Sequence, residues 1–459
     1  MKTPLVAPEL RELIQRHDIS TLQDFCKFMH PMAVADYLST LPPHDIWEVL
    51  RVLEPNLRAE IFSNLDEDVQ LEVAESLTRD ELAQLISDMP PDDRVDLFKK
   101  IPPEKQDLIL PALAKAERED IRKLASYPEG TAGSVMTSDY VALPPDITVR
   151  EAIERIRLEA PDRETVYYAY VVDEKRRLIG LVSLKDLILA PPHKLVKDIM
   201  YRDVIYARVT DDQEDVARMI QRYDLIALPI VNGDNVLVGI ITHDDAADII
   251  TQEHTEDLEK FTAIGGPHEA GVYMKTPVWH YFRYRAPWVI GLAGLELISG
   301  FIIHSFEETL SSLIILAMYL PMMAATGGNT GSQTAALVIR ALALGEVSAR
   351  NFFKVIFKEL QVGLLIGLLL GLLLWLKVSL FAQYGQIPAG LSASKVGFAI
   401  ALAFSLQVLL ATFLGASLPL AASALKLDPA FVAGPTLATL MDILGMLIYF
   451  SSAKIILNL

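Results

Sequence analysis

The last apolar stretch of the sequence contains one carboxylate, Asp442, about 13 residues after the stretch begins. A charged side chain at this depth in lipid costs about 3 kcal/mol on insertion scales, so it should face water, a cation or a basic partner. No Lys or Arg lies at a similar depth in the other apolar stretches to form an ion pair. This residue therefore favours a pathway for cations.

A second polar segment interrupts the apolar sequence at residues 321–346, PMMAATGGNTGSQTAALVIRALALGE. Its glycines, including Gly328, remove side-chain bulk, while Asn329 and Gln333 place amides at bilayer depth. Small residues allow helices to approach closely, and amides in hydrocarbon need partners. Alone, the segment fits an ordinary tight helix contact equally well. Together with Asp442 it indicates a polar route.

These residues belong to five apolar stretches, each long enough to cross about 30 Å of hydrocarbon as a helix. The stretches cover residues 286–305, 313–339, 360–381, 396–424 and 430–457. Basic residues precede the first stretch and lie between the second and third, whereas the 304–312 loop has neither Lys nor Arg. The positive-inside rule therefore predicts a multi-pass protein of the cytoplasmic membrane, with a cytosolic N-terminus and an extracytoplasmic C-terminus.

The charge is divided unevenly along the 459 residues. Residues 1–270 have a net charge of −22, and residues 271–459 have a net charge of +4. The acidic excess argues against nucleic acid, which needs Lys and Arg. No phosphate-binding P-loop and no nucleophile or acid–base set at the membrane face is found, which argues against an ATP-driven pump and against an enzyme. A large anionic body joined to a membrane domain points to cations.

The soluble region contains two kinds of repeat. Apolar residues recur every 12 positions from Leu41 to Leu113, and most units open with Pro or Asp, so residues 1–126 are predicted to form a solenoid of short stacked helices. A β–α–β–β–α pattern then occurs twice, with G-(L/I)-(V/I)-x-x-x-D closing each copy. It resembles a tandem pair of CBS modules, at 127–199 and 200–249. Such pairs often bind adenine nucleotides or metal ions.

Taken together, the whole chain resembles the MgtE family of magnesium channels. The order of parts matches: acidic helical repeats, a CBS pair, a connecting helix at 250–270, and five spans at 271–459, with GGNTGSQ in the second and P-x-x-A-T-L-x-D in the fifth. The resemblance implies an all-α repeat domain, an α/β CBS pair and an all-α membrane domain. It also implies a homodimer with a pore lined by the second and fifth spans. The implied pore residues are Asp442, Ala438 through its carbonyl, Asn329 and Gly328.

The resemblance also implies regulation by cytosolic magnesium. Each acidic cluster alone is more typical of a solvated surface. Under the resemblance, facing acidic surfaces repel until Mg²⁺ bridges them and pushes the connecting helices against the pore. The implied regulatory carboxylates are Asp92, Asp93, Asp96, Glu214, Asp224, Asp245, Asp248, Glu253, Glu256, Asp257 and Asp428.

Several questions stay open at the level of sequence. An ion-coupled transporter or exporter of Mg²⁺ or another divalent cation is the main alternative to a channel. The connecting segment could instead be a plain linker. ATP at the CBS pair is a further candidate ligand with no assigned residues. Glu296, inside the first span, lies outside the matched motifs, and its role is undecided between a cavity, an internal contact and a protonated group.

Overall fold

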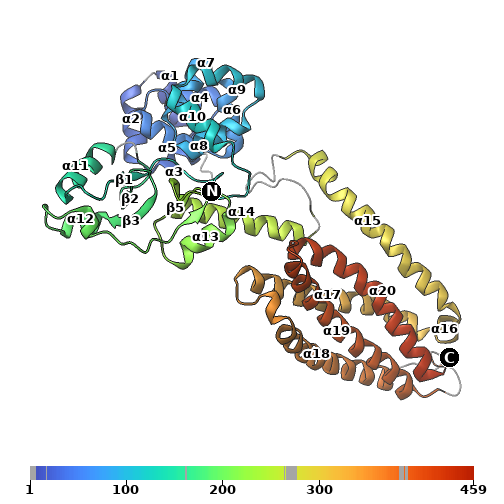
Figure 1. The fold of residues 1–459 in the computed structure, drawn as a ribbon. Helices are drawn as coiled ribbons and strands as arrows, with labels where there is room; N and C mark the ends of the chain where they lie inside the picture. Colours follow the sequence, from blue (N-terminus) through green and yellow to red (C-terminus); the bar gives the residue numbers. More distant parts are fainter. Residues whose placement is uncertain are drawn as a thin grey trace. The chain divides into compact units, whose positions relative to one another are not determined.

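The structure is a computed structural model that describes residues 7–16, 18–160, 163–262, 264, 276–381, 387 and 391–458. The chain divides into two compact units, Met1–Glu253 and His254–Leu459. The first contains a helical region and a pair of small sheets, and the second is helical in its described part (Figure 1).

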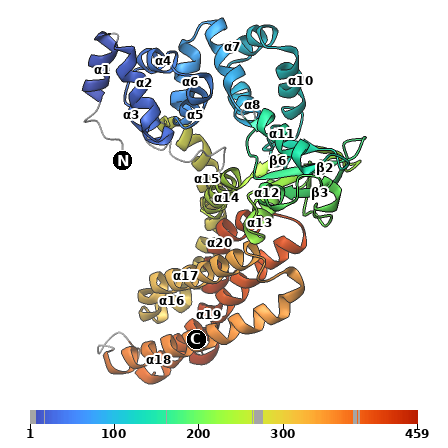
Figure 2. The ribbon, with the colours of Figure 1, turned by 90° about the vertical axis from the view of Figure 1, so that its left-hand side faces the viewer.

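The N-terminal helices of the first unit begin at 12-residue intervals from Ala7 to Lys115 (Figure 2). They are α1 (Ala7–Arg16), α2 (Ile19–Phe28), α3 (Pro31–Leu38), α4 (Pro43–Leu50), α5 (Pro55–Ser63), α6 (Glu67–Ser76), α7 (Arg79–Asp88), α8 (Pro91–Lys100), α9 (Pro103–Ile109), the 3₁₀ turn η1 (Leu110–Ala112) and α10 (Lys115–Leu124). The predicted helical repeat is confirmed. Proline at the first position of five of them starts a helix without losing a hydrogen bond.

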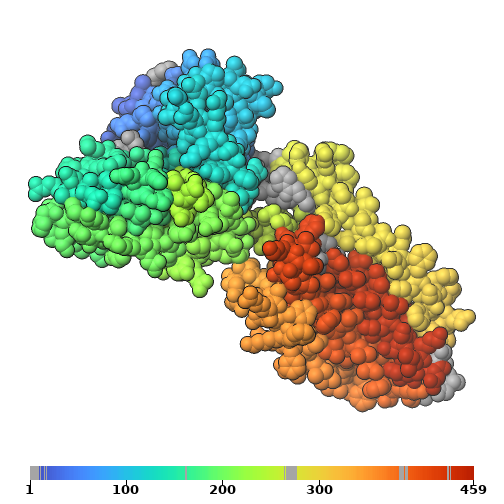
Figure 3. Space-filling view, in the orientation of Figure 1, coloured from blue at the N-terminus to red at the C-terminus, as the bar shows by residue number. Residues whose placement is uncertain are grey.

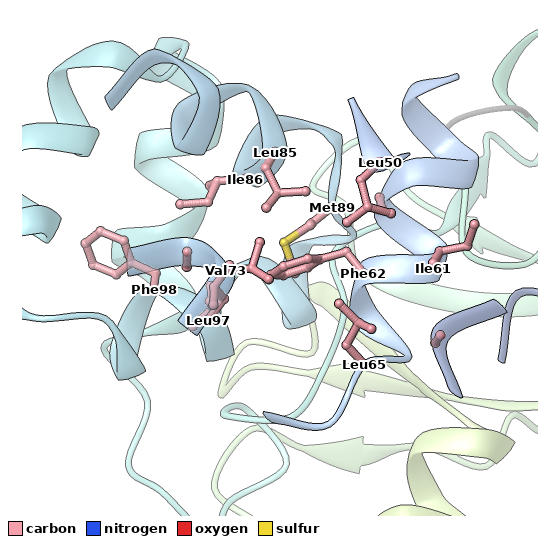
Figure 4. Close-up of a cluster of buried hydrophobic side chains, with 14 of the residues drawn as sticks. Leu50, Ile61, Phe62, Leu65, Val73, Leu85, Ile86, Met89, Leu97 and Phe98 are labelled. Carbon is pink, nitrogen blue, oxygen red and sulfur yellow. The ribbon is translucent and has the colours of Figure 1, made fainter. Parts of the chain in front are cut away.

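Each helix from α3 to α8 packs on the second helix after it. The apolar residue that closes each unit is buried, as predicted, from Leu41 to Leu113. Figure 4 shows part of the resulting core, where Met89 lies among Leu50, Phe62 and Leu85. Polar side chains cap the helix ends: the buried Arg94 donates from Nε to Ile86 O at 2.9 Å and from Nη2 to Met89 O at 2.8 Å.

Two three-stranded sheets follow, with the strand orders β1-β2-β3 and β4-β5-β6. Their elements are β1 (Val141–Leu143), α11 (Val149–Glu159), β2 (Tyr168–Val172), β3 (Leu178–Ser183), α12 (Leu184–Leu189), η3 (Val196–Asp198), β4 (Ala207–Arg208), α13 (Gln213–Arg222), β5 (Ala227–Val231), β6 (Leu237–Thr242) and α14 (His243–Phe261). In each sheet the first pair is parallel and the second antiparallel. The predicted duplication is thus present in the fold.

The two modules pack into each other through equivalent residues. Met136, which precedes the first sheet, lies against Gly239 of the second sheet, and Met200, which precedes the second sheet, lies against Gly180 of the first. A Cβ at Gly239 would come within 2.6 Å of the Met136 sulfur, and one at Gly180 within 2.5 Å of the Met200 sulfur. Glycine is therefore required at both positions because a methionine of the other module occupies the space.

The second unit contains α15 (Val278–Ser305), α16 (Glu307–Ser312), α17 (Ile315–Ala343), η4 (Ala349–Asn351), α18 (Phe352–Phe381), α19 (Ala393–Ala424) and α20 (Pro429–Leu457). Within the described residues, the four helices α15, α18, α19 and α20 are long and apolar enough to cross a membrane. The remaining predicted span is α17, which has 29 residues but contains the polar GGNTGSQ segment.

The central helix of this unit is α19, and 61% of its apolar 18-residue stretch is buried. Three glycines at four-residue spacing on α18, namely Gly363, Gly367 and Gly371, lie against it, and Ser405 donates a 2.8 Å hydrogen bond to the Gly367 carbonyl. Helices α17 and α20 pack on α19 and on each other. Close glycine contacts are typical of helix packing in lipid, where the hydrophobic effect does not drive association.

Candidate functional site

Asp442 lies near the middle of α20 and is half-buried. Ala438 is one turn earlier, on the same side of the helix, and is exposed. The neighbouring Met441 and Gly445 are buried against the rest of the unit. The carboxylate therefore lies at the border between the packed and the uncovered faces of α20.

The polar segment of α17 has two distinct faces. Gly327, Thr330, Gly331 and Thr334 are buried, and the Gly331 carbonyl lies where a Cβ at Gly415 of α19 would come within 2.5 Å. Asn329 and Gln333, one turn apart, are exposed on the opposite face, and Gly328 is half-buried beside them. An amide left without partners in hydrocarbon is costly, so this face needs water, an ion or another protein surface.

Gln407 of α19 was not predicted from the sequence. Its side chain lies between α17 and α20 and contacts both helices. Its side chain is buried, and Nε2 donates a 2.9 Å hydrogen bond to Met323 O of α17. The amide fits because Gly327 on α17 and Gly445 on α20 have no side chain. The available signal was a glutamine inside the apolar run FSLQVLL.

The end of α14 packs on the start of α20, both within the second unit. Lys260 Nζ lies 2.8 Å from Glu256 Oε1 and 2.8 Å from Asp428 Oδ2. Asp428 also caps α20 by accepting from the backbone N–H of Ala430 at 2.8 Å. Next to this contact, the Phe261 carbonyl lies directly against Gly434. Sequence reasoning identified Asp428 but not its lysine partner.

In this contact, Lys260 and Asp428 each stabilise the ionised form of the other. Partial burial opposes the ionisation of Lys260, but hydrogen bonds from its ammonium to Asp428 and Glu256 raise its pKa overall. Burial also opposes the ionisation of Asp428, but the hydrogen bond and charge of Lys260, with the backbone N–H groups of α20, lower the pKa of that carboxyl. Asp428 is thus an anion neutralised by a lysine in this arrangement.

A cluster of carboxylates lies within the first unit, where the first turn of α8 faces the start of α14. Burial raises the pKa of Asp92 well above its ordinary value, and the charges of Asp93, Asp245 and Glu164 raise it further. The Oδ1 atom of Asp92 is buried and accepts no hydrogen bond from the described residues. Burial likewise raises the pKa of Asp93, with added repulsion from Asp244 and Asp248.

Asp245 belongs to this acidic cluster and caps α14. Burial is the main cause that raises its pKa to about 6, and the charges of Asp244 and Asp93 add to it, although a hydrogen bond from Thr242 opposes the change. That bond joins Thr242 Oγ1 to Asp245 Oδ2 at 2.5 Å. Of the cluster, Asp92, Asp93, Asp245 and Asp248 were predicted. Glu164 and Asp244 were not predicted: Glu164 lies in the loop before β2, and Asp244 directly precedes Asp245 in the first turn of α14.

The other predicted carboxylates lie elsewhere. Asp96 is exposed and faces Lys99 and Lys100. Glu214 forms an ion pair with Arg218. Asp224 is exposed and has a left-handed backbone conformation after α13. Glu253 accepts a 2.7 Å hydrogen bond from Gln213 Nε2, and Asp257 is half-buried on α14. Within the described ranges, no three His, Cys, Asp or Glu residues are arranged to hold a metal ion.

The first sheet module has a cavity of about 760 Å³ on the side of its edge strand β1. Three arginines border it, Arg155, Arg163 and Arg176, and Arg176 Nη2 donates to Tyr140 OH at 2.9 Å. Beside Gly180 and Gly239 the space is filled by Met200 and Met136, respectively.

Comparison with known proteins agrees with this division into parts. The magnesium transporter MgtE of Bacillus subtilis is 37% identical over 75% of this chain and 73% of its own length. The chain belongs to the MgtE family. MgtE of Thermus thermophilus is 38% identical over 74% of this chain and 73% of its own. Family models match at residues 320–452 (divalent cation transporter), 29–130 (MgtE intracellular N domain), and 132–193 and 196–251 (CBS domain).

Two solved structures each match about half of this chain. The soluble part of a magnesium transporter is 31% identical with a TM-score of 0.51, covering 54% of this chain and 97% of that one. The cytosolic domain of the Mg²⁺ channel MgtE in complex with ATP is 37% identical with a TM-score of 0.49, covering 53% of this chain and 99% of that one. The predicted fold class, helical repeats followed by a CBS pair and membrane helices, is confirmed.

Proposed function

We propose that this MgtE family member is a magnesium-selective channel of the cytoplasmic membrane that closes when cytosolic Mg²⁺ binds to its acidic surfaces. The observation that carries the proposal is Asp442, a carboxylate in the middle of an apolar helix that packs on α17. Mg²⁺ prefers oxygen ligands in octahedral geometry and usually keeps several waters. Carboxylate, carbonyl and amide oxygens suit such a hydrated ion.

The proposal includes a homodimer in which α17 and α20 line the pore. Asn329 and Gln333 support it, because their amides lie on a face that the described residues leave uncovered. A second copy on this face would enclose a polar passage with a pair of Asp442 carboxylates and the Ala438 carbonyls. The Gly328 backbone would be open to the same passage.

The proposed closure by Mg²⁺ is supported by the energetics of the acidic cluster in the first unit. Burial is the main cause that raises the pKa values of Asp92, Asp93, Asp245 and Glu164, and repulsion from neighbouring carboxylates adds to it. A divalent cation among them would remove that repulsion and favour the conformation that holds them together. Asp96, Asp248, Glu214, Asp224 and Glu253 of the same unit would add to its negative potential.

The connecting helix offers a route from this cluster to the pore. Asp245 is at the start of α14, and Lys260 is at its end, one continuous helix of 19 residues. Lys260 binds Asp428 at the first turn of α20, the helix that carries Asp442. A shift of α14 caused by Mg²⁺ binding would therefore act on α20 through Lys260, Asp428 and the contact of Phe261 with Gly434.

The test is Mg²⁺ uptake into proteoliposomes under an imposed potential, at low and at high internal Mg²⁺. We expect wild-type uptake without a coupled ion at low internal Mg²⁺, reduced uptake at high internal Mg²⁺, and loss of uptake in Asp442→Asn. Glu308→Gln, which changes an exposed acid on α16 outside the apolar spans, is the control and should behave like wild type. Uptake that requires a counter-ion would favour the coupled transporter, and unchanged uptake in Asp442→Asn would overturn the pore assignment.

A further inference from the structure

Helices α15 and α20 run parallel and nearly in register. The rings of Trp288 and Phe431 are 5.1 Å apart near one end, and those of Phe306 and Phe450 are 5.1 Å apart near the other. These contacts are separated by 18 residues on α15 and by 19 on α20. Figure 3 shows the two helices side by side, α15 in yellow and α20 in red. Positions between the two contacts can therefore be matched across the pair.

This register brings Glu296 close to Asp442. Glu296 follows Trp288 by eight residues and Asp442 follows Phe431 by eleven, so the two differ by three residues, or about 4.5 Å along the helix axis. Side chains of glutamate and aspartate span that offset. The charge of Glu296 is also the one that acts on the Asp442 carboxylate. The helix register thus puts the two carboxylates in one neighbourhood, in agreement with this electrostatic effect.

The face of α15 that carries Glu296 is the one turned toward the packed helices. Between residues 290 and 300, the side chains that are not exposed are those of Leu292, Glu296 and Ser299, spaced by four and three residues along one helix face. Glu296 is therefore on the contact face with α20 rather than on the face left to lipid. A carboxylate kept at this depth needs a compensating group.

Ser299 supplies a second polar group on the same face. Its residue is 2% exposed, and its Oγ has no hydrogen-bond partner among the described residues. Ser299 follows Trp288 by eleven residues, as Asp442 follows Phe431, so the hydroxyl and the Asp442 carboxylate are at one level of the helix pair. A buried hydroxyl without a partner is unfavourable, and a water molecule bound to a cation would supply the missing hydrogen bond.

We infer that Glu296, Ser299 and Asp442 form a divalent-cation site inside the membrane unit, with Glu296 as its second carboxylate. The inference rests on the proposed function and adds a ligand from α15 to the pore carboxylate of α20. Each copy of the dimer would contribute two carboxylates, and a divalent cation compensates more of this negative charge than a monovalent cation does in a medium of low dielectric constant. The hydroxyl accepts a hydrogen bond from an ion-bound water. The site therefore selects divalent over monovalent cations.

The experiment measures Mg²⁺ uptake by the full chain in proteoliposomes as a function of external Mg²⁺, with and without 100-fold excess Na⁺. Glu296→Gln should raise the half-saturating Mg²⁺ concentration about tenfold and make uptake sensitive to Na⁺. Glu296→Asp, which keeps the charge, should lie between this variant and wild type. Ser299→Ala should raise the concentration about threefold, and Ser299→Thr should not. Glu359→Gln, a half-buried acid on α18, is the matched control.

The outcomes separate the inference from the proposed function. Wild-type behaviour of Glu296→Gln together with loss of uptake in Asp442→Asn overturns the two-carboxylate site and leaves the channel proposal intact. Tighter Mg²⁺ binding in Glu296→Gln also overturns it, because Glu296 would then act only by repulsion. Absence of Mg²⁺ uptake in the wild type would instead refute the channel. If Glu296→Gln does not fold, a Glu296→Asp variant with wild-type affinity and wild-type response to Na⁺ overturns the inference.

Discussion

The raised pKa of Asp245 predicts that removing its charge stabilises the Mg²⁺-free first unit. The pKa is about 6 in the folded unit, against about 3.9 in an unfolded chain. At 1.36 kcal/mol for each unit of pKa, ionisation in the folded state costs up to about 3 kcal/mol. Solvent screens part of this because the side chain is only half-buried, so we expect about 1.5 kcal/mol.

The sign follows from linkage. A carboxyl whose pKa is higher in the folded state contributes stability below about pH 4, and this contribution is lost as the pH rises through 6. Asp245→Asn should therefore raise the free energy of unfolding at pH 7.5 by about 1.5 kcal/mol, and the difference should vanish near pH 4. The asparagine oxygen still accepts the hydrogen bond from Thr242, so the cap of α14 is retained.

The assay is urea unfolding of the separately expressed residues 1–253, a compact unit with its own buried core, followed by circular dichroism. Asp186→Asn is the matched control, because Asp186 has the same place in the first module and accepts from Ser183 Oγ at 2.5 Å. This control should gain no stability at pH 7.5. Added Mg²⁺ should stabilise the wild type more than Asp245→Asn. Equal Mg²⁺ responses, or an Asp245→Asn unit less stable than the wild type at pH 7.5, would refute the reasoning.

Two further predictions concern the membrane unit. Gly445→Ala places a methyl group 2.5 Å from Gln407 Nε2, so it should lower stability by about 1–3 kcal/mol, and Gln407→Ala in the same chain should restore most of the loss. Thermal unfolding in detergent would show this, and additive losses would contradict it. Lys260→Ala leaves Asp428 without its ion pair and should weaken the inhibition of uptake by internal Mg²⁺, whereas Lys260→Arg should preserve it. Unchanged inhibition in Lys260→Ala would disconnect this pair from gating.

The sequence alone was sufficient to predict the fold where a local pattern of residues repeats. The 12-residue spacing from Leu41 to Leu113 gave the helical repeats, because a short helix with one buried closing residue has to meet the next such unit. Four of the five predicted spans are confirmed as apolar helices long enough to cross a membrane. The GGNTGSQ segment explains why α17, although as long, is not among these four.

Residues brought together by tertiary packing could not be predicted in the same way. Glu164 lies in a loop of the first CBS module, and only the folded unit shows its charge acting on Asp245. Lys260 and Asp428 are far apart in the chain, so their pairing could not be predicted from the charge pattern around either residue. Glu296 was noted as a polar residue in an apolar run and Gln407 was not, and the partners of both depend on the register of neighbouring helices.

The reciprocal contacts of Met136 with Gly239 and of Met200 with Gly180 have a consequence for the evolution of the soluble region. Each module, taken alone, would have an unfilled space beside the glycine of its second antiparallel strand. Its own methionine would also lose the surface on which it packs. Losing or exchanging a single copy would therefore damage both halves at once. Selection should keep the duplicated segments as an inseparable twofold block, inherited and recombined only together.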